Sequence, residues 1–347
     1  METFSKILMK TLAGVFAILF VATTALAFVL YNAEQSVFNA ELYKQALDEE
    51  SVYQRLPELI AQELATAAQQ PGRSDILALF RNLSEDEWRG FVTQFLPPAE
   101  LETLAEGAVT QVMAYLNGES DSAVLSLASL KTHLAAPEGI SVIYGTLKVQ
   151  PDCSLEQLTA IAMGQSEMIL CNPPDTFLFI DLRPVIEAEI QAAVSLVPDQ
   201  VTIISPNDIR LQDLQNLKTL RTIMYLSPLV PMLCLLAITA LAVRSFRDWL
   251  GWWGYPFLFA GLVGMLLGGM SRPLATWFFG IAISPKLPEI LSADMVEVCS
   301  DLVASVVHNA LKPVVLEAGV MALAGLVMVA ISILIRVRTK KRAANQG

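Results

Sequence analysis

Four long apolar stretches divide the chain, at residues 11–31, 222–243, 255–280 and 314–335. Each has about the 20 apolar residues that a helix needs to cross the hydrocarbon core of a bilayer, so the pattern predicts four membrane spans. The first stretch follows Lys6 and Lys10 and contains "ALA" at 25–27, which also fits a cleaved signal peptide. Because the apolar run continues through "FVLY" to spanning length, we interpret it as an uncleaved signal-anchor.

Polar sequence with helical periodicity fills residues 32–221. In "SVYQRLPELIAQEL" the apolar side chains recur at helical steps and lie on one face. Ser84 and Glu87 predict a capping box at a helix start, and Asn117 with Gly118 predicts a helix end. Only "VTIIS" at 201–205 resembles a strand, and one isolated strand does not make a sheet. We therefore predict an all-α membrane protein with four transmembrane helices and a large helical domain between the first and second spans.

Basic residues flank the spans on one side only. With four crossings that side carries nine Lys or Arg residues and two acidic ones, which predicts that it is cytoplasmic and that 32–221 is extracytoplasmic. The predicted division is a cytoplasmic N-terminus 1–10, spans 11–31, 222–243, 255–280 and 314–335, a cytoplasmic loop 244–254, an extracytoplasmic helical loop 281–313 and a basic cytoplasmic tail 336–347. Because no Gly or Pro interrupts the approach to Pro228, we also predict a helical stalk continuous with the second span.

The predicted outer domain is strongly acidic. Residues 32–221 carry 27 acidic and 11 basic side chains, a formal charge of −16, whereas the whole chain carries −11. Such a surface repels nucleic acid and anionic lipid, so we exclude nucleic acid as a direct partner. The predicted partners are the lipid bilayer that holds the spans and another envelope protein or a second copy of this chain.

Cys153 and Cys171 are the two cysteines of residues 32–221. Disulfides form and persist outside the cytoplasm, so the predicted topology favours a bridge between them. Ser154 with Gln157 predicts a capped helix directly after Cys153. The alternatives are free thiols and a metal or redox pair, although the spacing lacks C-x-x-C and one histidine in the domain cannot complete a zinc site.

Small residues line two of the predicted spans. They recur at Ala260, Gly264 and Gly268 in the third span and at Ala318, Ala322 and Gly325 in the fourth. Such stripes let helices approach closely, either within the chain or between chains. Arg272 and Glu317 lie at similar predicted depths near the outer ends of these spans. They either form an ion pair or extend separately to water.

Motifs of catalysis and cofactor binding are missing from the sequence. It has two histidines and lacks H-E-x-x-H, a P-loop and a G-x-G-x-x-G fingerprint, so we predict no catalytic site, no metal site and no cofactor. The predicted function is that of a non-catalytic plasma (inner) membrane protein whose outer helical domain binds or organises a protein partner. A pore-forming or transport-associated subunit and a membrane-anchored enzyme with an unfamiliar site are the alternatives.

Overall fold

The structure is a computed structural model, and its description covers residues 2–69, 83–137, 150–163, 171–172, 176–177, 180–181, 183–205, 211–287 and 292–344, with single residues at 141, 145, 148 and 174. The chain divides into two compact units. The first unit contains Met1–Ala46, Ile209–Leu287 and Cys299–Gly347, and the second contains Leu47–Asp208 and Pro288–Val298. The second unit is therefore shorter at both ends than the predicted domain 32–221.

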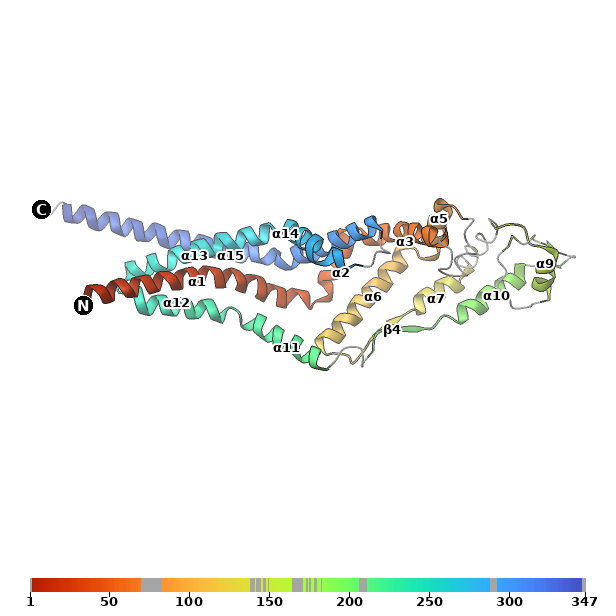
Figure 1. Cartoon of the computed structure of the whole chain (residues 1–347), viewed down its shortest axis with the longest axis horizontal. Helices are drawn as coiled ribbons and strands as arrows, with labels where there is room; N and C mark the ends of the chain where they lie inside the picture. The colour runs from red at the N-terminus through yellow and green to blue at the C-terminus, as the bar shows by residue number, and fades with distance from the viewer. Residues whose placement is uncertain are drawn as a thin grey trace. The chain divides into compact units, whose positions relative to one another are not determined.

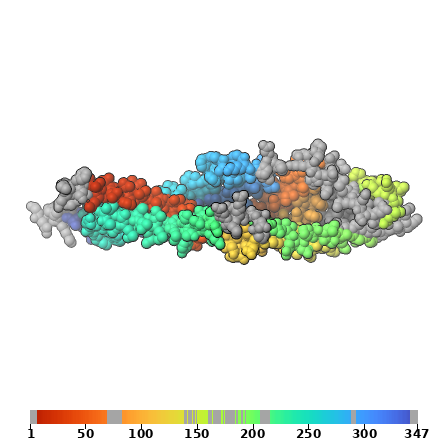
Figure 2. Space-filling view, turned by 60° about the horizontal axis from the view of Figure 1, so that its bottom comes forward, coloured from red at the N-terminus to blue at the C-terminus, as the bar shows by residue number. Residues whose placement is uncertain are grey.

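The first unit holds the apolar helices. They are α1 (Glu2–Val37), α11 (Leu211–Leu226), α12 (Leu229–Ala242), α13 (Phe246–Gly269) and most of α15 (Ala293–Ala344). Among the described residues, four helical segments are long and apolar enough to cross a membrane: Ile7–Val37, Gln215–Ala242, Phe246–Gly269 and Ala293–Thr339. These segments overlap the four predicted spans. Helices α1 and α12 lie side by side (Figures 1 and 2).

The structure divides two of the predicted segments differently. A turn at Ser227 and Pro228 lies between α11 and α12, within the apolar segment Gln215–Ala242 that joins the predicted stalk to the second span. The predicted span 255–280 is broken at Met270, after which come the short helix α14 (Ser271–Phe278), a π-helical turn Phe279–Ile283 and a 3-10 turn Ser284–Lys286. Pro273 in the first turn of α14 lacks a backbone N–H, so it cannot continue the hydrogen bonding of α13.

Helix α15 is also longer than predicted. The sequence pattern separated a helical loop at 281–313 from a span at 314–335, whereas the structure has a single helix of 52 residues with Pro313 inside it. Pro313 removes the hydrogen bond to the carbonyl of Asn309, four residues earlier. Membrane helices tolerate such a proline when other groups satisfy the freed carbonyl.

Small residues are buried in the first unit and large apolar ones are exposed. Ala13, Ala260 and Ala318 are completely buried, whereas Leu233 and Leu323 are more than 60% exposed. This distribution is typical of helices that pack through small residues and present large apolar side chains to lipid. A compact cluster of Phe20, Cys234, Ile238 and Ala260 joins α1, α12 and α13 at the centre of this packing.

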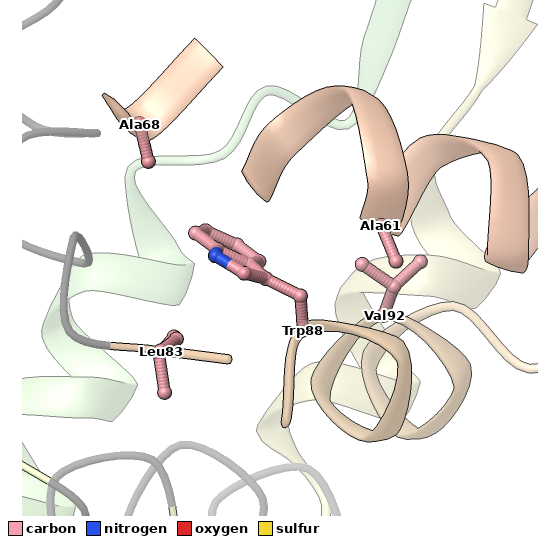
Figure 3. Close-up of a cluster of buried hydrophobic side chains, with 5 residues drawn as sticks. All are labelled: Ala61, Ala68, Leu83, Trp88 and Val92. Carbon is pink, nitrogen blue, oxygen red and sulfur yellow. The ribbon is translucent and has the colours of Figure 1, made fainter. Parts of the chain in front are cut away.

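The second unit is built on α3 (Val52–Gln69), α5 (Glu85–Phe95) and α6 (Pro98–Asn117), together with the last residues of α2 (Ala40–Glu49). Trp88 of α5 is 2% exposed and fills a space that Ala61 and Ala68 of α3 leave open (Figure 3). The predicted capping box is confirmed, since Ser84 and Glu87 exchange side-chain to backbone hydrogen bonds at the start of α5. These bonds lower the pKa of the exposed Glu87 carboxyl, the Ser84 backbone N–H being the larger cause.

The expectation of a lone strand is wrong. Strand β4 (Gln200–Ile204) pairs antiparallel with β1 (Ala123–Ser126), and the short strands β2 (Thr176–Phe177) and β3 (Ile180–Asp181) form a second two-stranded sheet. Strand β1 comes shortly after α6, which ends as predicted at Gly118, with a left-handed φ of 74°. The unit also contains α7 (Ala128–Ala135), α9 (Leu155–Ala162) and α10 (Arg183–Ser195), so the described residues are predominantly helical and include two small sheets.

Candidate functional site

Helices α13 and α15 touch through their backbones. A Cβ atom added at Gly261 would lie 2.5 Å from the Ala318 carbonyl oxygen and 2.7 Å from Ala322 Cα, and one added at Gly325 would lie 2.8 Å from Leu258 Cα. Side chains do not approach so closely, so only glycine fits at these two positions. Ala318, Ala322 and Gly325 of the predicted stripe therefore lie in this contact.

Gly264 and Gly268 face α15 as well. An added Cβ at Gly264 would be 2.7 Å from Ala318 Cβ and 3.1 Å from the Phe28 ring of α1, and one at Gly268 would be 2.7 Å from a Val315 methyl group. Ala260 lies elsewhere, in the buried cluster with Phe20 of α1 and Ile238 of α12. The three residues predicted as one stripe therefore belong to two different contacts of α13. Gly264 and Gly268 face α15, and Ala260 faces α1 and α12.

Gly254 and Gly261 also lie against α15 and were not predicted from the sequence. An added Cβ at Gly254 would be 3.0 Å from both Met328 Cβ and a Val329 methyl group. Gly254, Gly261 and Gly268 are spaced by seven residues, the period at which one face of a helix meets a partner crossing at a small angle. The seven-residue spacing of these glycines, and not the four-residue spacing, is the sequence signal that marks the face of α13 in contact with α15.

A second set of contacts in the first unit is polar and joins α1 and α14 to α15. The Asn32 side-chain amide of α1 donates to a Glu317 carboxylate oxygen of α15 at 2.9 Å, and Asn32 is 5% exposed. It also donates to the Phe28 carbonyl at 3.0 Å. In an apolar environment a carboxylate is costly to bury without a hydrogen-bond donor, so this contact ties the first spanning helix to the last.

Serine side chains make further polar contacts to α15. The Ser271 hydroxyl at the start of α14 donates to the Gly268 carbonyl at 2.8 Å and lies 3.0 Å from His308 Nδ1. Its oxygen can therefore accept a hydrogen from a protonated Nδ1. The Arg272 guanidinium donates to the hydroxyl of the fully buried Ser305 at 3.4 Å. Arg272 and Glu317, which the sequence placed as a candidate ion pair, thus each have a different partner. We call Asn32, Glu317, Ser271, His308, Arg272 and Ser305 the polar cluster.

Helix α11 is held to α1 by charge. Arg221 and Glu34 form an ion pair at 3.3 Å, with side chains 29% and 16% exposed, and the Arg221 guanidinium lies 4.2 Å from the centre of the Phe38 ring. Tyr31 and Tyr225 pack against each other in the same contact, with ring centres 6.1 Å apart. Because the pair is largely shielded from water, it is screened less by salt than a surface pair would be.

The polar cluster and the ion pair join different helices of the first unit. Among the described residues, no group of three or more His, Cys, Asp or Glu side chains is arranged to hold a metal ion. In the second unit, a hollow of about 740 Å³ beside β4 contains Lys131 and Asp199, which pair with each other at 2.8 Å.

The predicted disulfide between Cys153 and Cys171 is confirmed, with Cα atoms 4.8 Å apart. Backbone hydrogen bonds join the same two segments, from Cys153 N–H to the Asn172 carbonyl at 3.2 Å and from Asn172 N–H to the Pro151 carbonyl at 2.8 Å. The predicted cap is also present, since Ser154 and Gln157 exchange side-chain to backbone hydrogen bonds at the start of α9. We call residues 153–171 the disulfide loop, and within it the structure describes residues 153–163 and 171.

Large apolar side chains of the disulfide loop are exposed. Leu155 at the start of α9 and Met163 just after its end are each 72% exposed, while Leu158 between them is buried. Leu196, which follows α10, is 85% exposed, and α10 contacts α9. The sequence analysis identified the disulfide and the helix but not this exposed face, because the spacing of apolar residues does not show which of two faces is covered.

Comparison with known proteins finds no matching family model, no matching curated protein and no matching solved structure.

Proposed function

We propose that this chain is a non-catalytic plasma (inner) membrane protein that binds a protein partner through the disulfide loop of its second unit. In this proposal both termini are cytoplasmic, residues 32–221 are extracytoplasmic, and the first unit is the membrane anchor. Four apolar helical segments with outward-facing leucines support the anchor.

The orientation rests on where the basic residues gather. The start of α1, the junction of α12 and α13 and the end of α15 lie at one end of the first unit (Figure 1). Lys10, Arg244, Arg247, Arg336 and Arg338 belong to these three segments. An excess of Lys and Arg marks the cytoplasmic side of a membrane protein, so this end is the cytoplasmic one in our proposal.

The observation that carries the proposed function is the exposure of Leu155 and Met163 in a covalently closed loop. Exposing two large apolar side chains to water is unfavourable, and a partner that covers them gains about 25 cal/mol per Å² of apolar surface removed from water. The disulfide and the backbone hydrogen bonds beside it already hold the two ends of the loop together. A segment whose ends are already joined loses less conformational freedom on binding than one whose ends are free.

Site-specific photo-crosslinking in intact cells tests this function. A photoreactive amino acid at Met163 is expected to give a discrete adduct with one protein, whereas the same group at the exposed Thr103 of α6 is expected to give none. Replacing both cysteines by serine should weaken the adduct, because the loop is no longer closed. Equal adducts from Met163 and Thr103 would overturn the proposal. The same holds if a chain that lacks residues 35–205, with the photoreactive group placed elsewhere, forms an adduct with the same protein.

A transport-associated role is the second candidate, and the observation that favours it is the pair of ionisable side chains Glu317 and His308 on the spanning helix α15. Ionisable groups in membrane helices often mark ion or proton pathways. Reconstitution into vesicles decides between a structural and a transport role. Proton or cation flux that depends on the protein and disappears in Glu317→Gln would favour transport, whereas unchanged flux would leave Glu317 as a helix-packing residue.

A further inference from the structure

The first unit contains an open groove at its basic end. The groove has a volume of about 780 Å³, and three helices line it. Its lining residues are Ala17, Ile18, Val21 and Ala22 of α1, Arg247 to Val263 on one face of α13, and Ser332, Ile333 and Arg336 of α15. This volume is within the range of sites that hold small ligands.

The chemistry changes along the groove. Its deeper walls are apolar and include Val21, Phe259 and Val263, whereas the guanidinium groups of Arg247 and Arg336 lie at its basic end. From Arg247 to Val263 the helix rises about 24 Å. That length is close to the thickness of one leaflet with its headgroup region, roughly 20 Å. The groove therefore matches a membrane lipid, which has an apolar chain at one end and a charged group at the other.

The charges of the groove favour an anion. Asp248, the acidic side chain in its lining, is engaged at the start of α13, where its carboxylate accepts from the Ser245 hydroxyl at 2.8 Å. Within the part of the chain that the structure describes, neither Arg247 nor Arg336 has an ion pair or side-chain hydrogen bond. Two guanidinium groups against one carboxylate leave a net positive site, and arginine binds phosphate through paired N–H donors.

We propose that this groove binds one anionic phospholipid, with the phosphate between Arg247 and Arg336 and an acyl chain along the apolar wall of α13. The groove and the disulfide loop share no residues, and this proposal does not rest on the proposed protein partner. The lipid fills an opening between the first, third and last spanning helices and thereby stabilises their packing.

Native mass spectrometry of the delipidated full-length protein tests the proposal. One phosphatidylglycerol per chain is expected to remain bound, and phosphatidylcholine with the same acyl chains should bind at least about tenfold more weakly. The double variant R247Q/R336Q should lose at least about tenfold in phosphatidylglycerol affinity. Its matched control is R244Q/R338Q, which removes two charges at the same end from arginines outside the groove and should bind as the unmodified protein does.

Two further measurements examine the apolar part. Phosphatidylglycerol brominated on its acyl chain should quench tryptophan fluorescence, and Trp252→Phe should remove most of that quenching because Trp252 lines the groove. Ala22→Trp, which fills the groove without changing its charge, should lower the affinity while the protein elutes normally.

Three results would overturn the proposal. Equal affinity for the two lipids would show an unspecific annular lipid, and equal losses in the two double variants would show general attraction to the basic end. If the protein is a dimer that R247Q/R336Q converts to a monomer, the groove is an interface between copies of this chain.

Discussion

Gly261→Ala should push α13 and α15 apart. The added Cβ would lie 2.5 Å from the Ala318 carbonyl oxygen and 2.7 Å from Ala322 Cα, whereas ordinary contacts of a Cβ lie at 3.4–4 Å. The obstructing atoms belong to the backbone of α15 and cannot rotate away. Relief therefore requires the two helices to separate by about 1 Å.

The energetic consequence follows from that separation. A gap of about 0.5–1 Å removes a quarter to a half of the dispersion attraction across a contact, and overpacking a well-packed core costs about 1–3 kcal/mol. Alanine is a better helix former than glycine by up to about 1 kcal/mol, which acts in the opposite direction. We expect the free energy of unfolding of Gly261→Ala to be about 1–3 kcal/mol lower than that of a glycine-to-alanine variant whose added Cβ meets no obstacle.

Gly14→Ala in α1 and Gly269→Ala at the end of α13 are the matched controls, because an added Cβ at either position has nothing within 4 Å. The assay is thermal unfolding of the full-length protein in detergent, followed by tryptophan fluorescence and by elution as a single species. If Gly261→Ala unfolds at the same temperature as the controls or above them, the close approach of the two helices is refuted.

Three further outcomes can be measured on the same protein. Tyr53 is 3% exposed, and its burial, followed by the charges of Glu106, Glu102 and Asp48, raises the pKa of its hydroxyl to about 12. The neutral hydroxyl therefore stabilises the folded protein fully below pH 10, and this stabilisation is lost as the pH rises toward 12. Chemical unfolding at pH 9 and 11.5 should therefore show a loss on the order of 2 kcal/mol that is absent in Tyr53→Phe. Trp88→Ala should lower the free energy of unfolding by about 3–5 kcal/mol in a urea titration, and a loss under 1 kcal/mol would contradict the packing around Trp88. Asn32→Leu should cost about 1–3 kcal/mol because Glu317 loses its donor, whereas the double variant with Glu317→Leu should recover most of that loss in thermal unfolding.

The spans could be predicted from sequence because length and hydropathy decide them locally. Their ends could not be placed as well. The predicted limit between the loop 281–313 and the span 314–335 lies inside α15, which continues through Pro313. The Gly268–Gly269 pair followed by Pro273 was a stop signal inside an apolar run. The capping boxes at Ser84 and Ser154 were predicted because both partners lie within four residues of each other.

Contacts between distant segments could not be predicted in the same way. The β1–β4 pairing joins Ala123 to Ile204, and nothing in either short segment specifies the other. The same holds for Asn32 and Glu317: the sequence identified Glu317 as unusual in its position but assigned Arg272 as its candidate partner on the basis of depth alone. The disulfide was predictable because only two cysteines were available in the domain.

The hydrogen bond between Asn32 and Glu317 links residues 285 positions apart, in the apolar segments Ile7–Val37 and Ala293–Thr339. At about 5–20 residues per second, synthesis of the intervening chain takes roughly 15 to 60 s. During that interval the Asn32 amide can donate to the Phe28 carbonyl of its own helix, but its second acceptor, Glu317, has not been synthesised. The contact between α1 and α15 therefore forms only after α15 has been synthesised, long after the residues of α1.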